Sequence, residues 1–115
     1  SELQKVALSG HRQFFFGSDS APHLKKAKFT EFCCAGVYST KYAISNILEF
    51  FWLNKKTANL NKFLTINGSN HYDLDFDKKV LGYKRNKKSK FQKFTKFEDD
   101  FLINYNHYNN LWSQV

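Results

Sequence analysis

The stretch FFFGSDSAPH, residues 14–23, decides how this chain is interpreted. Three consecutive aromatic residues have no polar face, so they predict a strand at about 13–17 that is buried on both sides, as in a parallel sheet. Gly17 allows the backbone to turn, and Asp19 and His23 follow it. In α/β barrels, the catalytic groups lie at the carboxyl ends of such strands. The stretch therefore predicts an active site, although Asp19 could also cap a turn and His23 could be an ordinary loop histidine.

The segment GSDSAPH (residues 17–23) is followed by Ala35 within CCAG (residues 33–36), twelve residues after His23. Together these residues resemble the last barrel strand and its loop in the dihydroorotases, in the single-domain bacterial branch of the zinc amidohydrolases. The similarity is tight over residues 14–36 and looser toward the C-terminus. It implies an α/β fold, namely the C-terminal part of a (β/α)8 TIM barrel: the last strand, the active-site loop, the following helices and a C-terminal tail.

The length agrees with a fragment rather than a whole barrel. A complete barrel takes roughly 250 residues, and this chain has 115 and no methionine. The resemblance thus divides residues 1–115, a C-terminal fragment of one barrel domain, into a strand and active-site loop at 14–36, helices at 40–65 and a tail at 74–115.

The first residues, SELQKVALS, predict the end of an amphipathic helix with Leu3, Val6 and Ala7 on one side. Gly10 then stands at the position where helices commonly stop. The loop at 18–38 would be long enough to suggest a functional role.

Two further helices are expected after this loop. Thr40 predicts an N-cap for a helix reaching about Leu53. Its apolar positions recur at helical spacing and should pack on the outer wall of a barrel; they are Ala43, Ile47, Phe50 and Phe51. A second helix is expected over 59–65, closed by Asn67-Gly68.

The pattern beyond Asp73 is weaker. Alternation predicts an edge strand at 74–77 and a second strand at 101–103. The tail as a whole is expected to wrap the barrel outside the active site.

The resemblance implies a reaction and residue roles. Dihydroorotases interconvert N-carbamoyl-L-aspartate and L-dihydroorotate in de novo pyrimidine biosynthesis, so the chain is expected to belong to a cyclic amidohydrolase. In the family, two zinc ions share a hydroxide and a carboxylated lysine. Asp19 matches the aspartate that is both a metal ligand and the catalytic proton carrier. His23 matches a residue that binds the substrate carboxylate, and Ala35 matches a further substrate contact.

The remaining metal ligands of the family are not found in this chain. Its histidines are His11, His23, His71 and His107, and no two are separated by a single residue. One aspartate cannot hold a two-zinc centre, so the chain alone is expected to be inactive. His71 and His107 are interpreted as surface or packing residues.

The net charge of +8 supports an alternative from another functional class. Basic and aromatic residues alternate in KKVLGYKRNKKSKFQKFTK (residues 78–96), as in a small nucleic-acid-binding module. Against this, the chain has 16 lysines and only 2 arginines, whereas selected phosphate sites favour the arginine fork. Nucleic acid is therefore not expected as a partner.

The other partners follow from composition and resemblance. No apolar run approaches the ~18 residues of a membrane span, and no signal peptide is evident, so a cytoplasmic location without membrane contact is expected. Cys33 and Cys34 are adjacent and are expected to be reduced thiols. The resemblance implies a small-molecule substrate and a homodimer.

Overall fold

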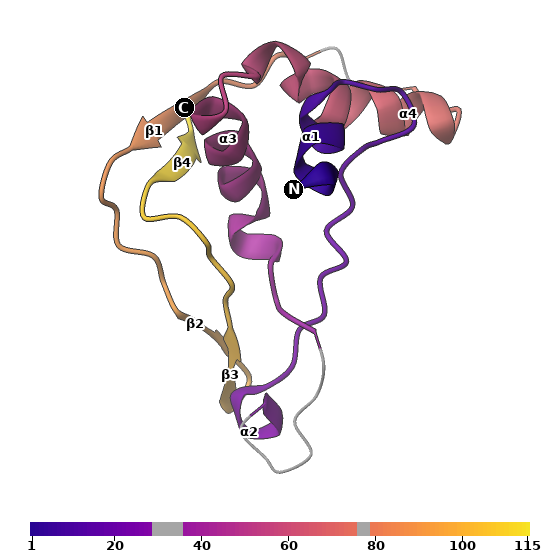
Figure 1. Cartoon of the computed structure of the whole chain (residues 1–115). Coiled ribbons are helices and arrows are strands. Elements are labelled where there is room, and N and C mark those ends of the chain that lie inside the picture. Colours follow the sequence, from indigo (N-terminus) through magenta and orange to yellow (C-terminus); the bar gives the residue numbers. More distant parts are fainter. Residues whose placement is uncertain (29–35, 76–78) are drawn as a thin grey trace.

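The computed structural model describes residues 1–28, 36–75 and 79–115. Both helices and strands are present, in agreement with the predicted α/β class (Figure 1). The elements, in chain order, are α1 (Glu2–Leu8), α2 (Lys25–Lys28), a 3-10 turn (Thr40–Tyr42), α3 (Ala43–Leu53), a 3-10 turn (Thr57–Asn59), a π-helical turn (Lys62–Ile66), α4 (Asn67–His71), β1 (Tyr83–Asn86), β2 (Phe94–Phe97), β3 (Asp100–Ile103) and β4 (Leu111–Gln114).

Helix α1 ends where the sequence predicts. Gly10 follows it with a φ of +76°, in the left-handed region that favours glycine. A capping box links Ser1 and Gln4 at its start. The buried residue is Leu8, whereas Leu3, expected on the packed side, is 82% exposed. The helix was thus predicted correctly and Val6 and Ala7 are half-buried, but Leu3 does not lie on the packed side.

The predicted strand at 13–17 is not formed within the part of the chain that the structure describes. Instead, the segment lies along the helical residues that precede and form α4. The Phe16 amide donates to the Phe63 carbonyl over 3.0 Å. The Asn67 side chain donates to the carbonyl of Phe14. A strand needs another strand as its hydrogen-bond partner, and the observed partners are helical, so the aromatic run is not part of a strand.

Helix α3 occupies the predicted range, but two details differ. Thr40 is not its N-cap: it starts the 3-10 turn before α3, and its hydroxyl donates to Ser20 Oγ over 2.8 Å. The buried face also differs, because only Phe51 of the four predicted apolar positions is buried. The buried residues of α3 are Ser45, Leu48, Glu49 and Phe51.

The second predicted helix continues past its expected end. Helical structure runs through Asn67 and Gly68 to His71, so this pair does not close the helix. Gly68 serves packing instead: a Cβ at this position would lie 3.3 Å from Cδ2 of Phe15. The glycine lets the aromatic segment approach the helix closely.

The tail is a long antiparallel ribbon with two paired regions. β2 pairs with β3 across a short turn, and β1 pairs with β4 outside them. β3 confirms the strand expected at 101–103. Leu74 and Asp75 of the other expected strand are not in a strand, and the rest of that prediction falls on 76–78, outside the described residues. In Figure 1, β1 and β4 lie beside α3, while β2, β3 and α2 form the opposite end of the molecule.

The buried core is small. Among the described residues, the buried hydrophobic side chains are Leu8, Leu48 and Phe51. Phe51 is fully buried and its ring packs 5.4 Å from that of Phe63, centroid to centroid. The core therefore lies between α3 and the helical residues before α4.

Candidate functional site

The two ends of the predicted active-site loop are joined to each other. We call residues 18–24 and 36–40 the loop flanks. The Ala21 amide donates to the Val37 carbonyl over 2.9 Å. Ser20 Oγ accepts hydrogen bonds from the Ser39 amide at 3.2 Å and from the Thr40 hydroxyl at 2.8 Å. The GSDSAPH motif is thus attached to the residues immediately before α3.

The close approach of the loop flanks depends on Gly36. Its φ is +95°, and a Cβ there would lie only 2.5 Å from Cβ of Ala21. No side chain fits at that distance, so glycine is required on both conformational and steric grounds.

Asp19 is presented by a left-handed backbone. Its φ is +42°, an unusual value for a residue other than glycine, although aspartate tolerates this region better than most. The side chain is exposed and makes no hydrogen bond or ion pair with the described part of the chain. A free carboxylate of this kind can bind a metal or accept a proton.

His23 lies at a small cleft of about 110 Å³. The cleft walls come from both loop flanks and from the end of β3; they are Ala21, His23, Gly36, Val37, Tyr38, Ile103, Asn104 and Tyr105. The tail thus contacts the loop flanks. Asp19 is on the same loop as His23, but it is exposed and is not among the residues that line this cleft.

The other predicted site residue, Ala35, lies outside the described residues, as do Cys33 and Cys34. His71 packs its ring against Phe15 and Tyr72, and His107 packs against Tyr108. Both histidines are therefore packing residues, as predicted.

The donors present do not make a metal site by themselves. Within residues 1–28, 36–75 and 79–115, no group of three or more His, Cys, Asp or Glu side chains could hold an ion. Asp19 is a chemically suitable ligand, but a single carboxylate does not fit the two zinc ions that the resemblance implies.

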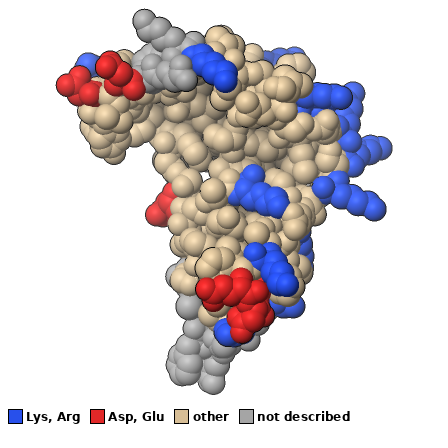
Figure 2. Space-filling model, turned by 180° about the vertical axis from the view of Figure 1, so that it is seen from behind, with Lys and Arg blue, Asp and Glu red and all other residues tan. Residues whose placement is uncertain are grey.

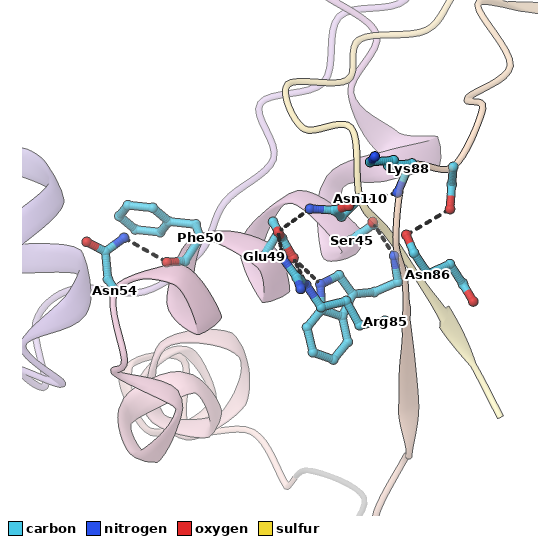
Figure 3. Close-up of polar contacts among 10 residues, drawn as sticks. Ser45, Glu49, Phe50, Asn54, Arg85, Asn86, Lys88 and Asn110 are labelled. Carbon is cyan, nitrogen blue, oxygen red and sulfur yellow. Dashed lines mark hydrogen bonds and ion pairs between the residues drawn. The ribbon is translucent and has the colours of Figure 1, made fainter.

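A buried carboxylate that the sequence did not reveal lies on α3 (Figure 3). Glu49 is 0% exposed and accepts two hydrogen bonds from Arg85, at 2.8 and 2.6 Å. The indole N–H of Trp112 donates to it at 2.8 Å, and the Asn110 amide does so at 3.0 Å. Residues of β1 and β4 thus converge on one side chain of α3. We call these four residues the Glu49 cluster.

The Glu49 cluster holds its carboxylate in the ionised form. The hydrogen bonds from Arg85, more than those from Trp112 and Asn110, lower the pKa of Glu49 from 4.5 to about 2, although burial opposes this shift. The pair also raises the pKa of Arg85. The cluster attaches the tail to α3 and is remote from His23, so we assign it a structural role.

The basic side chains are spread over the surface of the molecule. Figure 2 shows most of the Lys and Arg side chains along its right-hand edge, the side that carries the ribbon, and acidic side chains in separate groups at the upper left and in the lower part. Lysines of the 78–96 segment that the structure describes, including Lys84, Lys87 and Lys93, are exposed. This arrangement is that of a solvated face.

Comparisons with known proteins identify relatives in sequence. No protein-family model matches the chain. A dihydroorotase of Jannaschia sp. (strain CCS1) is 43% identical over 72 residues, which are 63% of this chain and 21% of that protein. A dihydroorotase of Synechococcus sp. (strain CC9902) is 31% identical over 86 residues, which are 75% of this chain and 25% of that protein.

Solved structures give the same family. A crystal structure of dihydroorotase from Saccharomyces cerevisiae, in complex with 5-fluoroorotic acid, matches with a TM-score of 0.81 and 32% identity over 98% of this chain and 33% of that one. The dihydroorotase structure from Campylobacter jejuni matches with a TM-score of 0.76 and 31% identity, over 97% of this chain and 32% of that one.

The matched relatives do not favour the nucleic-acid alternative. In the part of the chain that is described, no helix is both long and apolar enough to cross a membrane.

Because sequence and structure comparisons agree, the chain is a homologue of the dihydroorotases, corresponding to about a third of the length of their solved structures.

Proposed function

We propose that this chain is the C-terminal part of a dihydroorotase barrel and supplies one side of its active site. The observation that carries the proposal is the structural match over 98% of the chain, at a TM-score of 0.81 and 32% identity, to a dihydroorotase. That match includes the loop flanks that present Asp19 and His23. The chain spans about a third of such a structure. The complete active site would therefore need further strands and loops of the barrel.

In the proposed reaction, Asp19 is the proton carrier. During ring opening, water adds to the carbonyl carbon of the ring amide and the carbon–nitrogen bond breaks. Asp19 accepts the proton of the attacking water and returns it to the leaving nitrogen. An exposed carboxylate without competing hydrogen bonds within the described structure is suited to both steps. Ring closure uses the same transfers in reverse.

His23 is proposed to bind the carboxylate of the substrate, and Ala35 to contact the substrate through its backbone. His23 lies at a cleft between the loop flanks and the tail, and its imidazole can donate a hydrogen bond to an anion. Asp19 would contribute one ligand to a pair of zinc ions. The other ligands, including a carboxylated lysine, would come from residues that are not in these 115 residues.

The assembly expected for such an enzyme is a cytoplasmic homodimer acting on N-carbamoyl-L-aspartate and L-dihydroorotate. The enzyme would be a hydrolase of pyrimidine biosynthesis. Both statements rest on the homology to dihydroorotases.

The test is the substitution Asp19→Asn in the complete natural polypeptide that carries these 115 residues. It preserves the size of the side chain but removes the proton acceptor. Turnover is expected to fall by roughly 10²–10⁴-fold in both directions, the usual cost of losing general acid–base catalysis.

Asp73→Asn is a matched control, because Asp73 is also exposed and has a positive φ of 53°, close to the 42° of Asp19. It should retain normal turnover. Near-normal activity of Asp19→Asn, with metal content unchanged, would show that Asp19 does not have the proposed role.

A further inference from the structure

The ribbon touches the loop flanks at two places. Leu102 of β3 forms an antiparallel bridge with Leu24, and Asn104 forms a parallel bridge with Tyr38. The Tyr105 amide donates to the Tyr38 carbonyl over 2.8 Å. Each flank of the loop is therefore attached to the same short stretch of the tail.

Asn104 is the buried residue of that stretch. It is 5% exposed, and its Nδ2 donates to the Gln92 carbonyl and to Thr95 Oγ1, both at 2.8 Å. The Thr95 hydroxyl in turn lies 3.2 Å from Asn104 Oδ1 and donates to it. The backbone amide of Asn104 donates to the Lys93 carbonyl over 2.8 Å. One side chain thus ties the residues around the start of β2 to the point where the chain leaves β3 and meets Tyr38.

The same stretch forms a wall of the cleft at His23. Ile103, Asn104 and Tyr105 line it from the tail, facing Ala21 and Tyr38 from the loop flanks. A displacement of Asn104 would therefore move both the cleft wall and the backbone bond that holds Tyr38.

We propose that Asn104 is a positioning residue for the candidate active-site loop: its buried side-chain amide, through Gln92 and Thr95, fixes the stretch of the ribbon whose backbone contacts the loop flanks, and so sets the position of His23. The consequence for catalysis rests on the proposed function, whereas the consequence for the loop does not. Asn104 acts through the backbone contacts of Tyr38 and Tyr105 and makes no contact with substrate.

The first test is hydrogen exchange in the complete natural polypeptide. In Asn104→Ala, the amides of Ala21 and Tyr105 are expected to exchange faster by on the order of tenfold, the effect of losing a buried hydrogen bond on a local opening equilibrium. Amides within α1 and α3 should keep their wild-type rates, which separates loop loosening from general unfolding.

Asn86→Ala is the matched control. Asn86 belongs to the same ribbon and donates to Ser113 Oγ over 3.0 Å, but it joins β1 to β4, away from the stretch of the ribbon that contacts the loop flanks. It should leave the exchange of Ala21 and Tyr105 unchanged. Equal acceleration in the two variants, or none in Asn104→Ala, would overturn the proposal.

A milder pair of variants covers the case in which Asn104→Ala fails to fold. Thr95→Val removes the hydroxyl that bonds both atoms of the Asn104 amide, and Thr95→Ser keeps it. Faster exchange at Ala21 and Tyr105 is expected in Thr95→Val and wild-type exchange in Thr95→Ser. Identical behaviour of these two variants would also overturn the proposal.

Kinetics then separate this inference from the proposed function. If His23 binds substrate, Thr95→Val should raise KM by several-fold and leave kcat nearly unchanged, because the group that is displaced acts in binding. If the wild-type polypeptide lacks dihydroorotase activity, the proposed function fails while the exchange experiment still decides the role of Asn104. Altered exchange with unchanged KM would contradict the link to His23.

Discussion

Asp19 and His23 are four residues apart on one loop, but their replacement is expected to change different kinetic constants. A group that binds the substrate carboxylate makes nearly the same contact in the ground state and the transition state, so its loss raises KM and spares kcat. A hydrogen bond to a charged group contributes about 1.5–3 kcal/mol. His23→Ala in the complete polypeptide should therefore raise KM by roughly 10–150-fold.

Steady-state kinetics and metal analysis test this prediction. Metal content should not change in His23→Ala, because His23 is not proposed as a ligand. His71→Ala is the control, since His71 packs on Phe15 and Tyr72 and should leave KM unaltered. A collapse of kcat with KM constant would instead assign His23 to proton transfer.

Glu49 predicts a dependence of stability on pH. Its pKa in the folded chain is about 2, below the value of 4.5 for an unperturbed carboxyl. The unfolded state therefore binds more protons between these values, so the stabilisation is complete above about pH 5 and is lost as pH falls toward 2. The shift corresponds to on the order of 3 kcal/mol.

Urea unfolding at pH 7 and pH 3 in the complete polypeptide measures this effect. Glu49→Gln should be less stable at pH 7 and should lose less stability than the wild type on acidification. Glu2→Gln is the matched control, because Glu2 is exposed and its ion pair with Lys5 contributes little. If Glu49→Gln and the wild type lose the same stability between the two pH values, Glu49 is not the titrating group.

At the scale of elements, the contact between Phe15 and the helix containing Gly68 can be measured by a double-mutant cycle. Alanine is favoured over glycine within helices by about 1 kcal/mol. In Gly68→Ala, however, the new Cβ would lie 3.3 Å from the Phe15 ring, which is held by the extended aromatic segment. The single variant should therefore gain no stability, or lose some.

Replacing Phe15 by leucine should remove the steric conflict, so that alanine at position 68 can stabilise the helix. In a Phe15→Leu background, Gly68→Ala is expected to stabilise by up to about 1 kcal/mol, so the two substitutions should be non-additive. Thermal or urea unfolding of the four chains gives the coupling. Simple additivity would mean that glycine is not needed for this contact.

Elements with a local signal were predicted from the sequence. The spacing of apolar residues indicates helix α3, and Gly10 marks the end of helix α1. Both signals depend on residues that are only a few positions apart. The GSDSAPH motif likewise marked the loop that carries Asp19 and His23.

Elements with distant partners were not predicted. Nothing in the local sequence pattern indicates that Glu49 is buried, because its partner Arg85 is 36 positions away. Gly68 looked like a helix stop because its packing against Phe15 is not local. The contact of Asn104 with Tyr38 was missed for the same reason, and with it the tail's share in the cleft at His23.

At the scale of the whole molecule, the chain is less compact than a self-contained domain. Its radius of gyration is 15.9 Å, compared with about 13 Å expected for a domain of this length. An apolar groove of about 690 Å³ lies between α3, the residues before α4 and the start of the ribbon. Phe14 is 43% exposed and Val80 is 90% exposed.

The isolated 115-residue polypeptide is therefore expected to aggregate or to stay molten, with no zinc bound at micromolar metal. Binding of a hydrophobic dye, a broad thermal transition and metal analysis after dialysis would check this. A sharp cooperative melt of a soluble monomer would contradict it and would show that these residues are a sufficient folding unit.

The nesting of the two paired regions in the tail has a consequence for the order of folding. β2 and β3 are joined by a turn at 98–99, so their pairing requires the closure of only a short loop. β1 and β4 are separated by residues 87–110, and their contact becomes entropically easier once the inner pair has formed. The β2–β3 pair should thus form first and the β1–β4 pair second. The docking of Trp112 and Arg85 on Glu49 would be a late event. Substitutions in the turn should then slow folding, whereas substitutions in the Glu49 cluster should mainly accelerate unfolding.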